Sequence, residues 1–426
     1  MERLIGVVGI LVLLGFCWLM SNNKKRINYR TVGVGMALQF AMAILLMKWE
    51  TGNNAMQWFA GKVTAFLFLA DSGTKFLFAN LADPAYMDRF GFVFAFRVLP
   101  IIIFFASFMG ILYYLGVMQK IVEVFAKVMC RLMKTSGSES LSCSANVFLG
   151  QTEAPLLVRP YLHDCTMSEL NAIMVGGFGT IAGSVMAGYI GMGVSAQHIM
   201  IASAMAAPGS LMVAKIIFPE TEHSKTGGDV KLPKIDVGSN LLDAASRGVT
   251  DGLMLSLNVA AMLVAFITLI ALADKILLVG DRVVDGRILG GAALANGEFS
   301  GVFPGSLKTF FGIVLSPLAF LMGIPRQDIL EVGNLLGTKL AVNEFVAYAR
   351  LAELLKTGGI SEKAGIMATY FLCGFANFSS IGIQIGGIGA LEPKRLEDLA
   401  VLGLKAMFGG AIVSCITACI AGLLVG

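Results

Sequence analysis

Charged residues are scarce in this chain. They make up 14% of its 426 residues, whereas about 25% is usual in soluble domains. Apolar residues make up 56%, and the mean hydropathy is +0.78. The net charge is only +4, with acidic and basic residues interspersed, so no basic stripe indicates a nucleic-acid partner. The composition excludes an ordinary soluble domain and predicts an all-α polytopic membrane protein embedded in the lipid bilayer.

Histidine is also scarce, and the cysteines follow no pattern. The three histidines, His163, His198 and His223, lie far apart, and the seven cysteines are scattered through apolar segments. Neither set has the spacing of a zinc site or of a disulfide framework. The chain also lacks a P-loop motif, which argues against coupling to ATP. We therefore expect a protein without a bound cofactor.

Long apolar segments recur along the chain and predict eight membrane crossings. They are expected at residues 4–20, 31–47, 92–118, 172–190, 199–218, 253–273, 365–389 and 399–425. Segments 54–83, 121–133 and 310–322 are amphipathic, interrupted or short, and we expect them to form interfacial helices. Residues 218–252 are expected to form a loop, and residues 274–300 a polar, glycine-rich connection.

A polar motif, Gly-Gln-Thr-Glu-Ala-Pro, interrupts the apolar sequence at residues 150–155. Thr152 is a good helix N-cap, Glu153 favours the positive end of a helix, and Pro155 is tolerated in a first turn. The apolar run before it, residues 141–149, is too short to cross a bilayer, which requires about 20 residues. The segment therefore predicts a re-entrant hairpin that carries a carboxylate into the membrane.

The same pattern recurs in the second half of the chain. Asn343 and Glu344 repeat the cap and the carboxylate 191 residues downstream (344 − 153), and predict a second hairpin over residues 331–354. A glycine-rich apolar segment follows each hairpin, at residues 177–185 and 374–382. Three expected crossings separate the hairpins, so the hairpins enter from opposite faces. This inverted repeat is typical of secondary transporters.

Several polar and aromatic residues allow two interpretations. Each glutamate is followed six positions later by an arginine, Arg159 or Arg350, and could simply form an ion pair with it. That spacing does not place the two side chains on one helix face, so we expect the glutamates to line a cavity. Core packing explains Val185 and Phe375 as well as ligand contact does. For Lys339, we expect the side chain to reach the membrane interface.

Three motifs in order resemble the signature of the concentrative nucleoside transporters, in a compact bacterial form: residues 150–155, residues 342–347 and residues 374–381. The resemblance runs through nearly the whole chain. It implies a secondary active symporter, not an enzyme, that imports uridine-like and also purine nucleosides with a sodium gradient by an elevator mechanism. It also implies a homotrimer. The basic residues 24–30 place that loop in the cytoplasm, and hence both termini on the periplasmic side of the bacterial inner membrane.

The resemblance divides the chain into four parts. Residues 1–118 hold scaffold helices and an interfacial helix, and residues 219–309 hold a loop, scaffold helix 6 and a connection. Residues 119–218 form a first transport repeat, with an interfacial helix, hairpin 1, broken helix 4 and helix 5. Residues 310–426 form the second, with an interfacial helix, hairpin 2, broken helix 7 and helix 8.

The resemblance also assigns binding residues. It places the nucleobase near Gln151, Thr152 and Glu153, with Val185 and Phe375 packed on it, and the ribose near Glu344, Asn377 and Ser380. Met262 and Leu263 on helix 6 are further candidates for contact with the base. It assigns the binding of the coupling sodium to Asn146, Leu149, Thr180 and Ile181, partly through their backbone carbonyls. Thr180 stands where a serine is expected, but it keeps the hydroxyl group.

Four alternatives stay open at this stage. The symporter could use protons, with Glu153 as the carrier, or its cargo could be another small polar solute such as an amino acid. The chain could also form a channel, which saturable uptake against a gradient would exclude. Finally, the two glutamates could serve a membrane enzyme as acid and base, and chemically unchanged substrate inside proteoliposomes would exclude that function.

Overall fold

The computed structural model describes residues 2–83, 86, 89, 93–226, 238–294 and 297–425. Within these residues the chain forms helices and no β-strand, apart from one isolated bridge between Ala293 and Phe299. The helical class predicted from the sequence is confirmed. Residue 92, at the start of the third predicted crossing, and residues 227–237 of the predicted central loop lie outside the described residues.

The first third of the chain folds largely as predicted. Its helical segments are α1 (Glu2–Leu19), η1 (Lys24–Arg26), α2 (Tyr29–Ala43), η2 (Ile44–Lys48), α3 (Glu50–Leu67), α4 (Ala70–Phe78), η3 (Ala79–Leu81), α6 (Phe94–Arg97), α7 (Leu99–Tyr114) and α8 (Val117–Met133). Gly116, with φ +74°, makes the left-handed turn between α7 and α8. The third crossing therefore ends at Tyr114, and the amphipathic helix begins four residues earlier than expected, at Val117.

The first hairpin and the first broken helix follow. The segments are α9 (Gly137–Ala145), η5 (Ala154–Val158), α10 (Arg159–Leu162), α11 (Met167–Gly179), α12 (Gly183–Gly191) and α13 (Ala196–Ile217). Capping boxes start two of them: Ser136 with Glu139 begins α9, and Thr166 with Glu169 begins α11. In each box the side chains satisfy backbone N–H groups that have no partner within the helix. Both helices can therefore begin at buried positions.

The sixth predicted crossing is longer in the structure than the sequence indicates. α14 spans Leu241–Asp281, and the π-helix η6 (Arg282–Ile288) continues it. The loop expected over residues 218–252 and the connection expected over residues 274–300 are therefore wrong where they overlap this helix. Gly248 and Gly252 are packing positions and not helix breakers, because β-carbons there would lie 2.5 Å from Ala106 and 2.8 Å from Ile103 of α7.

The second hairpin and the second broken helix complete the chain. The segments are α15 (Leu307–Leu321), η7 (Arg326–Asp328), α16 (Ile329–Ala341), α17 (Glu344–Thr357), α18 (Glu362–Leu372), α19 (Phe378–Leu391), η8 (Pro393–Arg395) and α20 (Leu396–Leu424). Asn343 caps α17 as expected, since its side-chain oxygen accepts from the Val346 N–H at 2.9 Å. Gly358, with φ +66°, ends the helix.

The two hairpins open toward opposite ends of α1. At the C-terminal end of α1, the Asn22 N–H donates to the last residue of α13 at 2.9 Å. Lys215 near that end of α13 pairs with Glu139 near the start of α9 at 2.7 Å. At the other end of α1, a β-carbon on Gly6 would lie 3.5 Å from the carbonyl oxygen of Met322, shortly before α16. This placement agrees with the inverted arrangement expected from the sequence.

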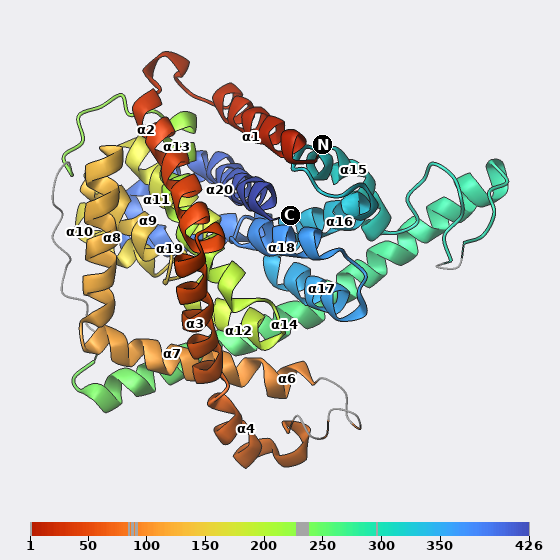
Figure 1. Ribbon diagram of the computed structural model, residues 1–426, viewed down its shortest axis with the longest axis horizontal. Coiled ribbons are helices and arrows are strands. Elements are labelled where there is room, and N and C mark those ends of the chain that lie inside the picture. The colour runs from red at the N-terminus through yellow and green to blue at the C-terminus, as the bar shows by residue number, and fades with distance from the viewer. Residues whose placement is uncertain are drawn as a thin grey trace.

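α11, α13, α18 and α20 lie toward the middle of the view, and α14 runs past them and projects beyond the rest of the molecule (Figure 1). Within the described residues, six helical stretches are long and apolar enough to span a membrane. Those at Met167–Gly191, Ala196–Ile217 and Pro393–Leu424 are 78–94% buried, whereas those at Tyr29–Lys48, Phe94–Tyr114 and Leu241–Ile288 are 17–22% buried. The two other expected crossings are the shorter α1 and the interrupted pair α18 and α19. The count of eight stays a prediction.

Candidate functional site

The breaks in the two broken helices meet in the interior. α11 and α12 are separated by residues 180–182, and α18 and α19 by residues 373–377. The Phe375 N–H donates to the Thr180 carbonyl at 3.2 Å, which joins the two breaks directly. Gly374 has φ +142°, and a β-carbon there would lie 2.7 Å from the Phe178 carbonyl oxygen. Only glycine allows the two backbones to approach so closely.

The tip of the first hairpin differs from the sequence prediction. The segment Ala154–Val158 is a short 3-10 helix, and Glu153, not Thr152, precedes it without a capping side-chain bond. The N-cap role predicted for Thr152 is therefore wrong, although Pro155 lies in the first turn as expected. The Glu153 carboxylate turns back and accepts from the Gly150 N–H at 3.1 Å. This local bond competes with a helix start and holds the tip as an irregular turn.

The tip of the second hairpin encloses its carboxylate. Glu344 is 5% exposed and accepts from the Tyr189 hydroxyl at 3.3 Å and from the Asn377 side-chain nitrogen at 3.0 Å. Arg350 instead pairs with Glu331 and Glu353, at 3.1 and 2.7 Å. A simple ion pair between Glu344 and Arg350 is therefore excluded. The carboxylate is held by two neutral donors, which leaves it capacity to accept from a ligand.

A cavity of about 510 Å³ lies between the two hairpin tips, the breaks and α14. Its lining includes all the residues predicted to bind substrate: Gln151, Thr152, Glu153, Val185, Glu344, Phe375, Asn377 and Ser380. Met262 and Leu263 of α14 also line it, as the sequence suggested. The same wall carries Asn343 and Ser379, whose amide and hydroxyl the sequence also suggested for the lining, and Ser184 and Asn258, which sequence reasoning did not place in a binding site. The cavity thus combines two carboxylates with amides, hydroxyls and the rings of Phe345 and Phe375.

Side-chain amides fix the positions of the polar groups on this wall. Asn377 caps α19, since its side-chain oxygen accepts from the Ser380 N–H at 2.9 Å. The Gln151 amide donates to the Ser380 hydroxyl at 3.3 Å, and Gln384 donates to Gln151 and to the Met174 carbonyl, both at 3.1 Å. The sequence analysis missed Gln384. Its signal is the one side-chain amide in a glycine-rich helix that is largely apolar.

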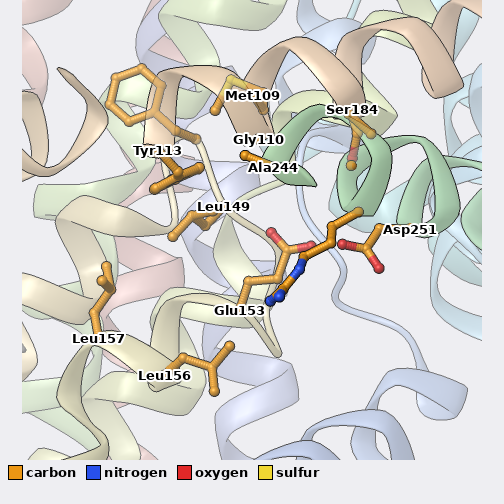
Figure 2. A pocket seen from close by; sticks show the side chains of 14 residues that line it. Met109, Gly110, Tyr113, Leu149, Glu153, Leu156, Leu157, Ser184, Ala244 and Asp251 are labelled. Atoms are coloured by element: carbon orange, nitrogen blue, oxygen red, sulfur yellow. The ribbon is translucent and has the colours of Figure 1, made fainter. Parts of the chain in front are cut away.

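A second cavity, of about 250 Å³, also has Glu153 in its lining (Figure 2). The first hairpin tip, α7 and α14 form its wall, which includes Tyr113, Arg247 and Asp251. Glu153 and Ser184 line both cavities. Glu153 is exposed, whereas Glu344 is buried. The two carboxylates therefore occupy different surroundings, one accessible from two sides and one enclosed.

The residues predicted to hold sodium gather beside the end of α11. Asn146 is completely buried, and neither its side-chain oxygen nor its nitrogen has a hydrogen-bond partner among the described residues. Its nitrogen would lie 3.3 Å from a β-carbon on Gly176. Thr180 donates to the Gly176 carbonyl at 2.7 Å and ends α11 in an extended conformation. Leu149 and Ile181, which lie close to Asn146 and Thr180 in the sequence, are also buried.

The polar atoms around the end of α11 suit a small cation. The last carbonyls of a helix lack partners within the helix and carry the negative end of its dipole. The unpartnered Asn146 amide lies near Gly176 in the last turn of α11, and buried polar groups without a partner call for an explanation. Amide, hydroxyl and carbonyl oxygens at an unwound helix are the groups that bind sodium in transporters. The predicted set therefore fits the ion.

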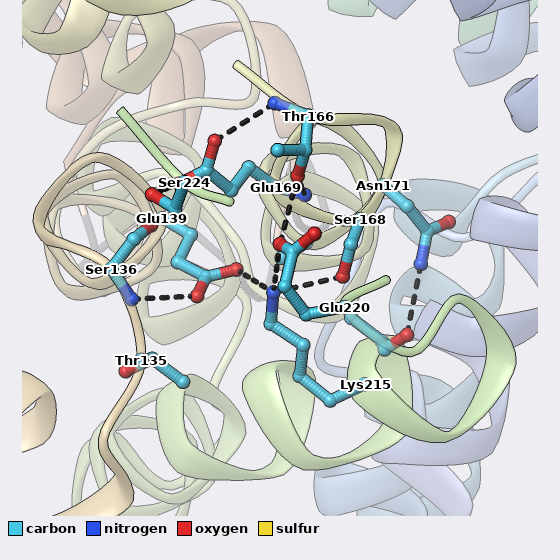
Figure 3. A network of polar contacts seen from close by, with 12 residues as sticks. Thr135, Ser136, Glu139, Thr166, Ser168, Glu169, Asn171, Lys215, Glu220 and Ser224 are labelled. Atoms are coloured by element: carbon cyan, nitrogen blue, oxygen red, sulfur yellow. Dashed lines mark hydrogen bonds and ion pairs between the residues drawn. The ribbon is translucent and has the colours of Figure 1, made fainter. Parts of the chain in front are cut away.

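A buried ion-pair network at the open end of the first hairpin was not predicted (Figure 3). Lys215 of α13 lies 2.7 Å from the Glu139 carboxylate and 3.5 Å from that of Glu220, and it donates to the Ser168 hydroxyl at 2.8 Å. The network ties α9, α11 and α13 together. Its sequence signal is the pair of capping boxes, each of which places a glutamate in the first turn of a helix.

The segment that follows α13 closes this network from outside. The hydroxyl groups of Ser224 and Thr226 both donate to the Glu169 carboxylate at 2.5 Å. Lys225 lies 2.9 Å from Asp164, and its ammonium group holds the pKa of that exposed carboxyl below its usual range. These contacts anchor the beginning of the central loop to the hairpin.

Comparisons with known proteins agree along the whole chain. Residues 8–81 and 198–422 match the N-terminal and C-terminal parts of the Na⁺ dependent nucleoside transporter family, and residues 95–196 match a nucleoside recognition (Gate) domain. An uncharacterized transporter from Haemophilus influenzae is 42% identical over 100% of this chain and 99% of its own length. The sodium/nucleoside cotransporter 1 of Rattus norvegicus is 40% identical over 99% of this chain and 64% of its own length.

A solved structure agrees with these sequence relatives. The structure of CNTnw in an inward-facing substrate-bound state superposes with a TM-score of 0.90. It shares 38% sequence identity and covers 100% of this chain and 98% of that one. The relatives are transporters and not enzymes. With its helices long enough to span a membrane, this chain is a multi-pass membrane protein that belongs to the Na⁺ dependent nucleoside transporter family.

Proposed function

We propose that the protein imports nucleosides by symport with sodium. The observation that carries the proposal is the cavity that collects all the predicted substrate residues, which come from two hairpins and two broken helices far apart in sequence. Its volume of about 510 Å³ lies within the range of about 300–1,000 Å³ usual for small-molecule sites. The sodium dependence of the family and of its named relatives supports the coupling ion.

The enclosed half of the cavity suits a ribose. A sugar hydroxyl can donate to the Glu344 carboxylate, and hydrogen bonds to a charged acceptor are stronger than neutral ones. Asn377 lies against the same carboxylate, and Ser380 lies one helical turn further along α19. A pentose offers several hydroxyls within this short distance, whereas an amino acid does not. The arrangement therefore favours a nucleoside over an amino acid.

The half of the cavity near the first hairpin suits a nucleobase. Gln151 and Thr152 offer an amide and a hydroxyl to the polar edge of a base, and Glu153 offers a carboxylate that accepts from its N–H groups. Phe375 and Val185 line the same space and can pack against the flat faces of the ring. Uridine fits this chemistry, and purine nucleosides likewise offer N–H donors on a polar edge and flat ring faces.

The transport mechanism follows from how the two layers divide the cavity. α9, α11, α18 and α20 of the two repeats are largely buried, whereas α7 and α14 belong to the exposed outer layer. Both cavities lie between these layers, with α14 contributing to each. We infer that the interior moves as a transport domain against a scaffold of outer helices, as the proposed four-part division of the chain requires. The exposed apolar surface of the scaffold suits lipid and a homotrimer contact.

The membrane orientation is part of the same proposal. A β-carbon on Gly6 would lie 3.5 Å from Leu423, so the start of α1 lies beside the end of α20. Both termini therefore lie at the same end of the molecule. The opposite end carries Lys24, Lys25 and Arg26, which favours the cytoplasm for that end. The termini then lie on the periplasmic side of the inner membrane.

Proton coupling is the second candidate, and one observation favours it. Glu153 lines both cavities and is exposed, so it could take up a proton from one cavity and release it into the other.

Thermal unfolding of the purified protein tests whether sodium or a proton is the coupling ion. Uridine should raise the unfolding temperature in sodium chloride but not in choline chloride at the same pH. Equal stabilisation in both salts would contradict sodium coupling.

A further inference from the structure

Lys339 is buried in the interior, contrary to the expectation that it reaches the membrane interface. It lies in the last turn of α16 and is 1% exposed. Its ammonium group donates to the Phe371 carbonyl at 2.7 Å and to the Ser414 hydroxyl at 3.1 Å. It forms no ion pair among the described residues. A buried charge without a counter-ion is costly, so an arrangement that keeps it needs a physical reason.

The ammonium group lies at the C-terminal end of the second half-helix. Phe371 is the second-last residue of α18, and its carbonyl lies where a helix has no backbone donor of its own. Ser414 of α20 lies beside it and donates to the Cys373 carbonyl at 2.8 Å. The negative end of the α18 dipole, the Phe371 carbonyl and the Ser414 hydroxyl therefore surround the charge. The C-terminal end of α18 therefore takes the place of a counter-ion for Lys339.

The first repeat has the same framework without a resident cation. α9, α11 and α13 correspond by their order and by the inverted repeat to α16, α18 and α20. Ser210 of α13 stands at the end of α11, since a β-carbon on Gly179 would lie 2.6 Å from its hydroxyl oxygen. Ser210 is thus the counterpart of Ser414. Yet the Ser210 hydroxyl and the Asn146 amide have no partner among the described residues.

We propose that Lys339 is a resident counterpart of the coupling sodium. Its ammonium group occupies, at the end of α18, the place that sodium takes at the end of α11. This inference rests on the proposed function, which assigns the sodium to Asn146 and Thr180. The second repeat then carries its cation permanently, and only the first repeat binds one from solution. Lys339 is a positioning residue, because it acts through the end of α18 and does not line the substrate cavity.

The inference makes a specific statement about ion number. With one break permanently occupied, one sodium should accompany each nucleoside. Replacing Lys339 with alanine removes the ammonium group and leaves space beside the Phe371 carbonyl and Ser414. Sodium can fill that space, so the variant should need two sodium ions to hold both breaks in shape. If Lys339 only filled volume, Lys339→Ala would bind the same number of sodium ions as wild type.

The experiment is a sodium titration of uridine binding by calorimetry, with wild type and Lys339→Ala. The wild-type curve should have a Hill coefficient near 1. For Lys339→Ala we expect a coefficient clearly above 1 and a half-saturating sodium concentration about tenfold higher or more, because two charge-assisted hydrogen bonds are lost. Lys339→Arg keeps the cation and should retain the wild-type slope. Lys405→Ala is the matched control, since Lys405 of α20 is bound at the surface to Asn22 at 2.6 Å.

The outcomes separate this inference from the proposed function. If wild type binds uridine without regard to sodium, the proposed function fails. If wild type depends on sodium but Lys339→Ala has the same curve, or folds and never binds uridine, only the role of Lys339 fails. If Lys339→Ala does not fold, we measure how many charges wild type moves per uridine in proteoliposomes. One charge per uridine supports the inference, and two charges overturn it.

Discussion

The side-chain nitrogen of Asn377 lies 3.0 Å from the Glu344 carboxylate, and this hydrogen bond joins the break of the second broken helix to the tip of the second hairpin. Asn377 also caps α19 through its oxygen, so one amide holds the start of a helix and orients a buried carboxylate. The Tyr189 hydroxyl fixes that carboxylate from α12 in the other repeat. Glu344 therefore lies where both repeats meet.

The first prediction concerns Glu344. Glu344→Gln keeps the volume and removes the charged acceptor, so uridine affinity should fall at least about tenfold, as a lost charge-assisted hydrogen bond implies. Calorimetry in saturating sodium measures it. Glu353→Gln, in an exposed ion pair on the same helix, should bind uridine like wild type. Undiminished affinity in Glu344→Gln would remove this residue from the site.

The second prediction concerns the aromatic wall. Phe375→Ala should weaken binding of uridine and adenosine by a similar factor, about two- to tenfold, because ring packing does not distinguish bases by their hydrogen bonds. Competition of each nucleoside against labelled uridine gives both affinities. If the variant lost one base and retained the other, Phe375 would act in selection and not in packing.

The third prediction concerns the ion site. Asn146→Ser shortens an unpartnered buried side chain at the end of α11, so the sodium concentration needed for half-maximal uridine binding should rise. Affinity for uridine at saturating sodium should stay close to that of wild type, because Asn146 does not line the substrate cavity. A sodium titration measures both quantities. An unchanged sodium requirement would place the ion elsewhere.

The fourth prediction concerns topology. Single cysteines at Asn23 and Ile288, in a chain without the seven native cysteines, should be labelled from opposite faces. Asn23 adjoins the basic segment Lys24–Arg26 and should be reached from the cytoplasm. Ile288, at the exposed end of η6, should be reached from outside. Gly228, another informative loop position, lies outside the described residues. Labelling of Asn23 and Ile288 from one face would contradict the inverted repeat.

The fifth prediction concerns the buried network. Lys215→Met leaves the Glu139 carboxylate buried without its partner at 2.7 Å, and this should cost on the order of 3 kcal/mol in folding free energy. The double variant Lys215→Met with Glu139→Leu should recover much of the lost stability, since the fully buried carboxylate is removed together with its partner and the remaining Glu220 is partly exposed. Thermal unfolding in detergent compares wild type, the two single variants and the double variant. A double variant less stable than either single one would show that the charges themselves are required.

Much of the site was predictable because its residues stand out against an apolar background. Glu344 and Asn377 interrupt long apolar segments, and a polar group in a membrane segment requires a partner or a ligand. The cap at Asn343 was predictable because it depends on a local hydrogen bond, from the Val346 N–H to the Asn343 side-chain oxygen. The tip at Thr152 was predicted wrongly, because the Glu153 carboxylate bonds to the Gly150 N–H and prevents a regular helix start.

Other features depend on distant contacts and leave little local signal. The full length of α14 was missed, because its first residues belong to a long polar stretch, and the contact of Gly248 and Gly252 with α7 leaves no local signal. Lys339 resembles an interfacial lysine until α18 brings a helix end to it. The partner of Lys215 lies 76 residues away (215 − 139), so no local pattern reveals the pair.

Uptake of labelled uridine into proteoliposomes tests the central claim most directly. An inward sodium gradient at equal pH on both sides should drive uridine above its outside concentration. A pH gradient in sodium-free buffer should not, and the uridine recovered inside should be chemically unchanged. Asn146→Ser liposomes should need more sodium for the same rate. Concentrative uptake driven equally well by protons without sodium would contradict sodium symport and assign the coupling to Glu153.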